Sequence, residues 1–463
     1  MVASNTYLAK FFLPLIVEQF LSIMTGIADT FIASSLGQDE VSSISLVDQI
    51  FVLINILLLS FANGSAILLS HSFGAKDFLQ CKKITRRMGF LTSIYTIFLV
   101  AILFVFRNFL LDFLFPSVTS EIKELSKPYF LLMIASIPFV ALFNCVSAIF
   151  KGLGDTKSSM WIALIMNILN ILGNFIFTKI FDFGINGIAW STFASRFFAG
   201  LAGVILILIK FQKTSSNKND NQILAQNSAE QIRPQNLVPA KQIPVPAKQI
   251  DKQIISLALP TSIENGLYQL GKLLVITFIA KMGREAIASN AACNVISLIG
   301  VLTGFAGSTA LQTLTAMSYG EKDFFGMKIN IKKCMLFIYA SFALINIPIF
   351  IFAEQITNLF HYEGETARLT ILLVRYHATF CTFFWPTASA FPSVLRSLGD
   401  VKFTLAVSTV SMWAIRIGLC YILSFSASLG VLGVWISMSI EWVVKSIAFV
   451  TRFFFLQKKS PTK

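Results

Sequence analysis

Long apolar stretches recur along the whole chain, and short polar turns separate them. A helix needs about 20 apolar residues to cross a bilayer. The apolar character here is continuous rather than alternating, which favours helices over the strands of a membrane barrel. The pattern predicts an all-α polytopic membrane protein with twelve transmembrane helices. The predicted spans are residues 11–36, 44–70, 89–111, 128–150, 158–180, 185–210, 253–280, 287–316, 334–353, 369–395, 403–425 and 430–456.

The first span has no small-residue cleavage site after a short apolar core, and it continues to about Leu36. We therefore expect it to remain in the mature protein rather than act as a cleaved signal.

Matched residues recur 246 positions apart, so the chain consists of two halves with one plan. Six spans in each half is an even number, and both halves then enter the membrane the same way round. This predicts two parallel six-helix repeats, related by a pseudo-two-fold along the membrane normal, around a central cavity. The matched pairs are Pro14 and Pro260, Glu18 and Glu264, Gly37 and Gly283, Gly74 and Gly320, Lys76 and Lys322, Asp77 and Asp323, Gly184 and Gly430, and Gly187 and Gly433.

Composition and charge support a membrane protein and argue against a nucleic-acid partner. The chain is 55% hydrophobic and only 13% charged, whereas soluble proteins carry about a quarter charged residues. With the N-terminus in the cytoplasm, 25 of the 37 Lys and Arg residues lie on the cytoplasmic side, seven lie opposite and five lie inside spans. This asymmetry follows the positive-inside rule. We expect a multi-pass protein of the cell (inner, cytoplasmic) membrane with both termini in the cytoplasm.

One polar segment, 211–252, interrupts the apolar pattern. It is rich in Gln, Asn, Lys and Ser, and residues 238–243 and 245–250 both read VPAKQI. Proline at that density opposes helices, and the segment has too little apolar content for a core. The predicted division is a six-helix bundle at 1–210, a flexible cytoplasmic linker at 211–252 and a second bundle at 253–463. The linker is either a plain spacer or a docking site for a partner.

Two kinds of turn repeat between the halves. The sequences at 74–77 and 320–323 follow the second span of each half, and those at 151–157 and 396–402 follow the fourth. Glycine allows a sharp reversal, and the Asp of each turn is suited to cap the next helix. Neither turn matches the phosphate-binding GxxxxGK[ST] pattern, so we expect structural roles.

The sequence offers no set of residues for catalysis or for a bound metal. Its six cysteines are scattered without a CxxC pair, and it has only three histidines. No nucleophile–base cluster and no ATP-binding motif is present. We predict that the protein is not an enzyme, has no cofactor, and draws energy from an ion gradient.

Acidic residues inside spans are the strongest functional candidates, because a charge there costs about 2.5–3.5 kcal/mol even on the lenient scale. Asp29 stands first, fifteen residues after Pro14, whose ring can kink the same helix. The alternative is that Asp29 lies at the outer interface and is merely solvated. The other acids within spans are Glu18, Asp48, Glu264 and Glu441.

These features together resemble the multidrug and toxic compound extrusion (MATE) family of membrane exporters. The likeness rests on Pro14 and Asp29, the two kinds of paired turn, and the glycine pairs at 184–187 and 430–433. It covers nearly the whole chain apart from the linker. The resemblance implies a secondary active antiporter that exports bulky, often cationic organic compounds or drugs by alternating access, in exchange for protons or sodium ions.

The resemblance also implies a coupling site in the first half. In the family the first-span Asp, here Asp29, is the coupling residue, and the proline lets its helix bend. Some relatives add an Asn, an Asp four residues later and a Thr eighteen residues beyond. This chain has Asn170 and Thr192 but carries Asn174 in place of the Asp. Oxygen ligands suit sodium, whereas the same polar residues can simply hold helices together.

In the second half, Glu264 matches a seventh-span acid of other relatives, but the acid they carry in the tenth span is missing here. Span 369–395 offers Arg375, Tyr376 and His377 instead. Glu264 either contacts a cationic substrate, together with Asp29 and Tyr268, or pairs with Lys272. We expect Pro14 and Pro260 to be hinges. Among the remaining charges, Asp48 is a possible partner of Arg196, and Arg416, Glu441 and Lys445 of one another.

Two other functions stay open. A flippase for lipid-linked oligosaccharides would need cations facing a pyrophosphate, and Arg196, Lys272, Arg375 and Arg416 are available. A membrane receptor or scaffold would signal through 211–252. The expected partners are small organic substrates and the lipid bilayer, with no nucleic acid, and we expect a monomer.

Overall fold

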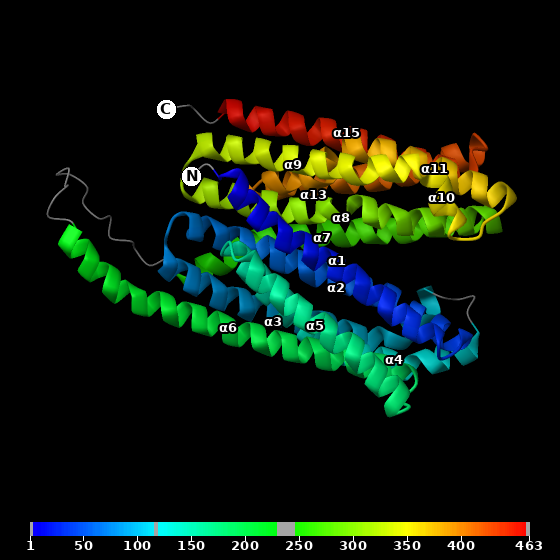
Figure 1. The fold of residues 1–463 in the computed structure, drawn as a ribbon, viewed down its shortest axis with the longest axis horizontal. Coiled ribbons are helices and arrows are strands. Elements are labelled where there is room, and N and C mark those ends of the chain that lie inside the picture. Colours follow the sequence, from blue (N-terminus) through cyan, green and yellow to red (C-terminus); the bar gives the residue numbers. More distant parts are fainter. Residues whose placement is uncertain (1–2, 115–118, 229–245, 460–463) are drawn as a thin grey trace.

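A computed structural model describes residues 3–114, 119–228 and 246–459, and those residues form helices and turns without strands (Figure 1). All twelve predicted spans are helical, in two repeats of six. The first half contains α1 (Asn5–Ser34), α2 (Gln38–Gly74), α3 (Phe78–Leu114), α4 (Ser120–Gly152), α5 (Thr156–Phe175) with the π-helical turn η1 (Ile176–Ile180), and α6 (Ile185–Ser228).

The second half repeats this order with more interruptions. Three of its spans are single helices: α7 (Ala247–Ala280), α8 (Arg284–Gly320) and α15 (Gly430–Lys459). The third span of this half is α9 (Phe324–Ile351), followed by the short α10 (Ala353–Asn358), and the fourth consists of α11 (Gly364–Trp385), η2 (Pro386–Ala390) and α12 (Pro392–Ser397). The fifth consists of α13 (Val401–Val410), η3 (Ser411–Ile417), α14 (Gly418–Tyr421) and η4 (Ile422–Ser426). Ten helices of the described chain are long and apolar enough to cross a membrane. The other two spans, α7 and α11–η2, carry more polar residues and complete the set of twelve.

The predicted linker overlaps helices at both ends. α6 continues to Ser228 because residues 211–228 contain neither proline nor glycine, and α7 begins directly after Pro246. Residues 229–245 lie outside the described part of the chain. The linker and the domain boundaries drawn from it therefore remain predictions.

The repeated turns behave as expected in part. Asp77, Asp155 and Asp323 each accept a backbone N–H bond three residues on, at 2.8–3.1 Å, and so cap the next helix. The fourth, Asp400, caps nothing and instead accepts a 2.7 Å hydrogen bond from Arg452. The predicted caps are thus confirmed at three positions and wrong at one.

Glycines 74 and 320 have a different role from the predicted chain reversal. The left-handed backbone belongs to the residues two positions later, Lys76 and Lys322, at φ 58° and 57°. A Cβ on Gly74 would overlap the carbonyl oxygen of Met317, and one on Gly320 would overlap that of His71. The two glycines therefore allow the ends of α2 and α8 to cross at close range, one helix from each half.

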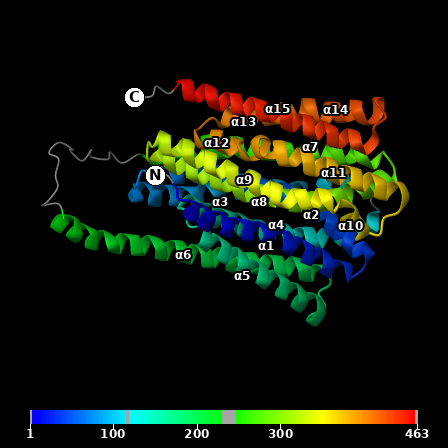
Figure 2. The ribbon, with the colours of Figure 1, turned by 45° about the horizontal axis from the view of Figure 1, so that its top comes forward.

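The first helix of each half starts in the opposite half. Before Pro14, residues of α1 such as Phe12 pack within the core of the second half, where the rings of Phe12 and Phe337 lie 4.3 Å apart. In both views α1 begins beside α9 and then runs along the first bundle (Figures 1 and 2). Before Pro260, Ile254 and Ala258 of α7 pack in the core of the first half.

After each proline the helix joins its own half. Ala33 of α1 lies in a first-half core, and Val275 and Ile279 of α7 lie in the second-half core. Pro14 and Pro260 therefore mark the places where α1 and α7 pass between the halves.

Candidate functional site

The main cavity lies between the two halves, where the sequence predicts it, and has a volume of about 900 Å³. Its walls carry polar and charged side chains from α1, α2 and α4 to α6 on one side. On the other side they come from α7, α8, α11 to α13, α15 and the π-helical turns η2 and η3. A cavity of this size accommodates a drug-sized organic molecule.

The halves touch at the end of the bundle where α1 begins and α15 ends. There the side-chain nitrogen of Gln312 donates to the carbonyl of Asn63 at 2.7 Å, and His71 Nε2 lies 2.7 Å from the carbonyl oxygen of Ser397. The Gly74–Met317 crossing lies at the same end. Toward the other end the cavity lining includes Ile279, late in α7, and Asn290, early in α8.

Asp29 lies in the last two turns of α1, half-buried, and lines this cavity. Asn174 of α5 donates a 2.5 Å hydrogen bond from Nδ2 to Asp29 Oδ1 and makes a longer 3.5 Å contact with Asn170 Oδ1. Asn170 Nδ2 in turn donates to Thr192 Oγ1 of α6 at 3.3 Å. The structure therefore brings together all four residues predicted for the coupling site.

One oxygen of this group lacks a partner. Asn174 Oδ1 is buried and accepts no hydrogen bond from the described residues. Together with the Asp29 carboxylate it offers the oxygen ligands that suit a hard monovalent cation or a proton. No cluster of three or more His, Cys, Asp or Glu residues for a metal ion exists in the described ranges.

A second acid extends the site. Asp48 of α2 is half-buried and accepts a 3.4 Å hydrogen bond from the hydroxyl of Tyr129. Arg196 of α6 interacts electrostatically with both Asp29 and Asp48, and its guanidinium lies 4.8 Å from the ring centre of Phe51. The predicted partnership of Asp48 with Arg196 is thus an electrostatic one, without an ion pair at contact distance. Two carboxylates share one cation here.

Glu18, deeper in the first half, is fully paired. Lys151 at the end of α4 lies 2.6 Å from its Oε1, which also accepts from Ser147 at 3.2 Å. Ser159 donates to the other oxygen at 3.0 Å. Since all these groups are buried, this is a closed ion pair rather than a free acid.

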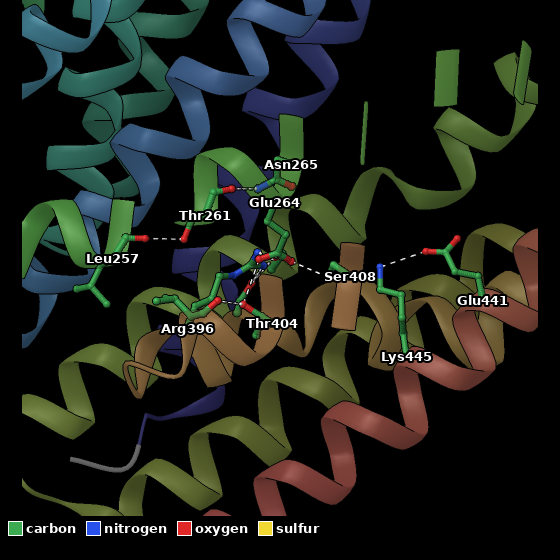
Figure 3. Close-up of polar contacts among 12 residues, drawn as sticks. Leu257, Thr261, Glu264, Asn265, Arg396, Thr404, Ser408, Glu441 and Lys445 are labelled. Carbon is green, nitrogen blue, oxygen red and sulfur yellow. Dashed lines mark hydrogen bonds and ion pairs between the residues drawn. The ribbon is translucent and has the colours of Figure 1, made fainter. Parts of the chain in front are cut away.

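Glu264 repeats this arrangement in the second half (Figure 3). Arg396 of α12 lies 3.4 Å from Oε1, and Ser408 and Thr404 of α13 donate to the two oxygens at 2.7 and 3.1 Å. Glu264 therefore pairs with Arg396 and not with Lys272. The sequence predicts only turns at Lys151 and Arg396. The 245-residue offset that aligns these two bases also aligns Ser159 with Thr404, which donate to Glu18 and Glu264, so this offset is the signal for the paired clusters.

The second half holds a further charged group at the cavity wall. Glu441 lies 3.2 Å from Arg416 and 3.4 Å from Lys445, which confirms the pairing expected among these three. Arg416 Nη1 also donates to the Tyr268 hydroxyl at 2.8 Å. Tyr268, Lys272, Arg416 and Lys445 all line the cavity. Arg375 instead pairs with Glu354 at 2.9 Å and does not line it.

Comparison with known proteins identifies the whole architecture. The model of the MatE family matches residues 14–176 and 260–422, two segments whose limits lie 246 residues apart. A transporter of Bacillus subtilis named YisQ is 26% identical, over 93% of this chain and 90% of its own. The probable multidrug resistance protein NorM of Thermotoga maritima is 24% identical, over 95% and 90%. A crystal structure of a MATE protein in the bent conformation has a TM-score of 0.83 at 19% identity and covers 98% and 97%.

Proposed function

The chain belongs to the MatE family of multidrug efflux transporters, and on that premise we propose that it is a secondary active antiporter. It exports bulky organic cations from the cell and takes up a proton or sodium ion in exchange. Its cavity is the substrate's path, and Asp29 is the group that the coupling ion neutralises. No cofactor is required, and a single chain contains both walls of the path.

The hydrogen bond between Asp29 and Asn174 carries this proposal. An ionised carboxylate only accepts hydrogen bonds, whereas a protonated one also donates. Protonation of Asp29 therefore favours rotation of the Asn174 amide, so that its unpartnered oxygen faces the new donor. A sodium ion would favour the same rotation, because it also needs the oxygen. Either event alters the link between α1 and α5 and removes the charge that attracts a cationic substrate.

The course of α1 connects this local event to the two halves. α1 holds Asp29 at one end and packs against the second half at the other, with Pro14 between. In α7, Thr261 donates to the carbonyl of Leu257 at 2.7 Å, beside Pro260. Such side-chain bonds to the preceding turn bend helices. Bending at Pro14 and Pro260 would let the halves rock while each keeps its own core.

The positive-inside pattern sets the direction. The end where the halves touch carries the start of α1, the end of α15 and the turns predicted to be cytoplasmic (Figure 1). With that end in the cytoplasm of a cell-membrane protein, the cavity faces outward, in the state that releases substrate and loads the coupling ion. A membrane potential contributes about 2.3 kcal/mol per charge per 100 mV to inward movement of the ion.

Dye efflux from proteoliposomes tests the proposal. A pH gradient and a sodium gradient are imposed separately on vesicles loaded with a fluorescent organic cation. Dye efflux that accelerates with an inward gradient of one ion, and does not do so in dye-loaded vesicles without protein, supports the antiporter. Efflux that ignores both gradients, with folded protein in the vesicles, would refute it.

A flippase for lipid-linked oligosaccharides is the second candidate, because Lys272, Arg416 and Lys445 offer cations to a pyrophosphate. Translocation of a labelled lipid-linked sugar across the same vesicles, without dye efflux, would favour it over the antiporter.

A further inference from the structure

Counted as formal charges, the groups that line the cavity together with the acids directly behind them give the two halves opposite net charge. The pairs Glu18–Lys151 and Glu264–Arg396 each cancel. In the first half Asp29 and Arg196 line the cavity, and Asp48 lies behind them, where Arg196 also interacts with it. These two acids and one base leave one excess negative formal charge. In the second half three bases, Lys272, Arg416 and Lys445, line the cavity. One acid, the buried Glu441, lies behind them and pairs with Arg416 and Lys445, which leaves two excess positive formal charges.

We propose that the second-half wall is a binding site for a carboxylate, so that the transported compound is a zwitterion that spans the cavity. Its cationic end lies against Asp29, and its carboxylate lies between Lys272 and Arg416. The inference rests on the proposed function in taking the cavity as the substrate's path, and it narrows the substrate class from organic cations to zwitterions.

The acid in this group serves to position the bases. Glu441 is fully buried, and its two oxygens lie 3.2 Å from Arg416 Nη1 and 3.4 Å from Lys445 Nζ. Tyr268 holds the same guanidinium through its hydroxyl, and Lys445 Nζ lies 5.0 Å from the centre of the Tyr268 ring. Figure 3 draws the contact between Lys445 and Glu441 in the same view as the Glu264 cluster. One carboxylate thus fixes two cations and cannot neutralise both.

Donors remain unused at this wall. Arg416 is nine-tenths buried, and its Nε has no acceptor among the described residues. Lys272 interacts electrostatically with both Arg416 and Glu441. Its side chain is exposed within the cavity, and no residue of the described chain forms an ion pair or hydrogen bond with it. A carboxylate has two oxygens and accepts charge-assisted hydrogen bonds from both kinds of group.

The neighbouring surface suits the organic part of such a molecule. Trp435, Trp442 and His377 line the cavity beside the cations, with the His377 ring 5.4 and 5.8 Å from the two indoles. Aromatic walls hold flat apolar groups, while the few charged groups fix their orientation. An aromatic amine with a carboxylate therefore matches both walls and the surface between them.

A matched pair of dyes tests the inference without any ion gradient: a rhodamine with a free carboxylate, and its methyl ester, which keeps only the cation. Binding to the purified full chain is measured by fluorescence anisotropy. We expect wild type to bind the acid more tightly than the ester. Lys272→Met should lower the affinity for the acid dye about tenfold, which is the typical contribution of one charge-assisted hydrogen bond, and should leave the affinity for the ester unchanged. Lys272→Arg should restore the affinity for the acid dye.

Ester binding reports whether each variant is folded, and Lys281→Met, at the exposed end of the same helix, is the matched control. Equal affinity of wild type for acid and ester, or equal loss of both in Lys272→Met, would overturn the inference. So would Lys272-dependent binding of a short prenyl phosphate without binding of the acid dye, since the anion would then belong to a lipid. A confirmed preference in a protein without gradient-driven efflux would refute the antiporter and leave the carboxylate site standing.

Discussion

The side-chain amide of Asn174 donates a 2.5 Å hydrogen bond to Asp29 and so ties α5 to the last turns of α1. Both residues belong to the first half, but the other end of α1 packs in the core of the second half. A change at Asp29 therefore acts on a helix that both halves share. In the proposed mechanism, this shared helix is what links ion binding to movement of the halves.

A carboxylate at position 174 should strengthen sodium binding. Asn174→Asp places a second negative charge beside Asp29 and supplies two oxygens where the amide supplies one. We expect sodium affinity to rise about tenfold, since one added charge–charge contact at an effective dielectric of about 20 is worth more than the 1.4 kcal/mol required. Sodium binding is measured by isothermal calorimetry on the purified protein.

Asn186→Asp, a residue of α6 outside the cavity, is the control for added charge. Unchanged sodium affinity in Asn174→Asp would mean that position 174 does not face the coupling ion.

The ion pair of Glu18 with Lys151 should matter mainly for stability. Glu18→Gln leaves a buried lysine without its charge partner, and such a loss costs about 3–5 kcal/mol. We expect a clear drop in the thermal unfolding midpoint in detergent. The double variant Glu18→Gln/Lys151→Met should recover most of it, because no uncompensated charge remains.

The exposed pair Glu365–Arg368 provides the comparison. Glu365→Gln should leave the midpoint unchanged, as surface pairs contribute little. A Glu18→Gln protein as stable as wild type would show that the buried pair is not needed for the fold.

Close approach at Gly74 should hold the termini end of the bundle shut. In Gly74→Val the side chain would overlap the carbonyl oxygen of Met317, so the α2–α8 crossing must open. We expect faster reaction of a cysteine at Ser60, which lines the cavity, with an impermeant maleimide added from the termini side. If the substitution shifts the equilibrium between the closed and the open crossing by about 1.4 kcal/mol, the labelling rate changes about tenfold.

The six native cysteines are replaced for this measurement. Gly89→Val is the matched control, since a Cβ at Gly89 meets nothing within 4 Å. Equal labelling rates in the Gly74 and Gly89 variants would rule out the crossing as the closed gate.

Straightening α1 should slow transport. Pro14→Ala restores a backbone donor and removes a ring that costs a helix interior about 3 kcal/mol, so a straight helix is favoured. We expect the variant to be at least as stable as wild type, with gradient-driven dye efflux about tenfold slower. Pro128→Ala, at an exposed position of α4, should transport normally. Wild-type efflux by Pro14→Ala would remove Pro14 as a hinge.

The sequence predicts the spans and the duplication well, because the length of an apolar stretch and a fixed offset between repeats do not depend on how the helices pack. It also predicts the Glu441–Lys445 pair, since residues four apart share a helix face. The sequence does not predict the Glu18–Lys151 pair, because Lys151 ends a helix and its surroundings read as a turn. Its partner lies 133 residues away, and only packing in space brings the two together.

The passage of α1 and α7 between the halves was also beyond the sequence. Apolar residues before Pro14 read the same whichever half they pack against, so Phe12 gives no sign that it contacts Phe337. The sequence shows the basic residues of the second-half wall, but it does not show that they gather at one place. Lys272 and Arg416 are far apart in sequence, and the fold places them on one side of the cavity.

Efflux by the Asp29→Asn variant tests the central claim most directly. Wild type, Asp29→Asn and the control Asp39→Asn, an exposed residue of α2, are reconstituted and given the same pH and sodium gradients. We predict that the control behaves as wild type, and that efflux by Asp29→Asn no longer responds to either gradient. Full, gradient-dependent efflux by Asp29→Asn would contradict the proposal that this carboxylate couples the ion to the movement of the halves.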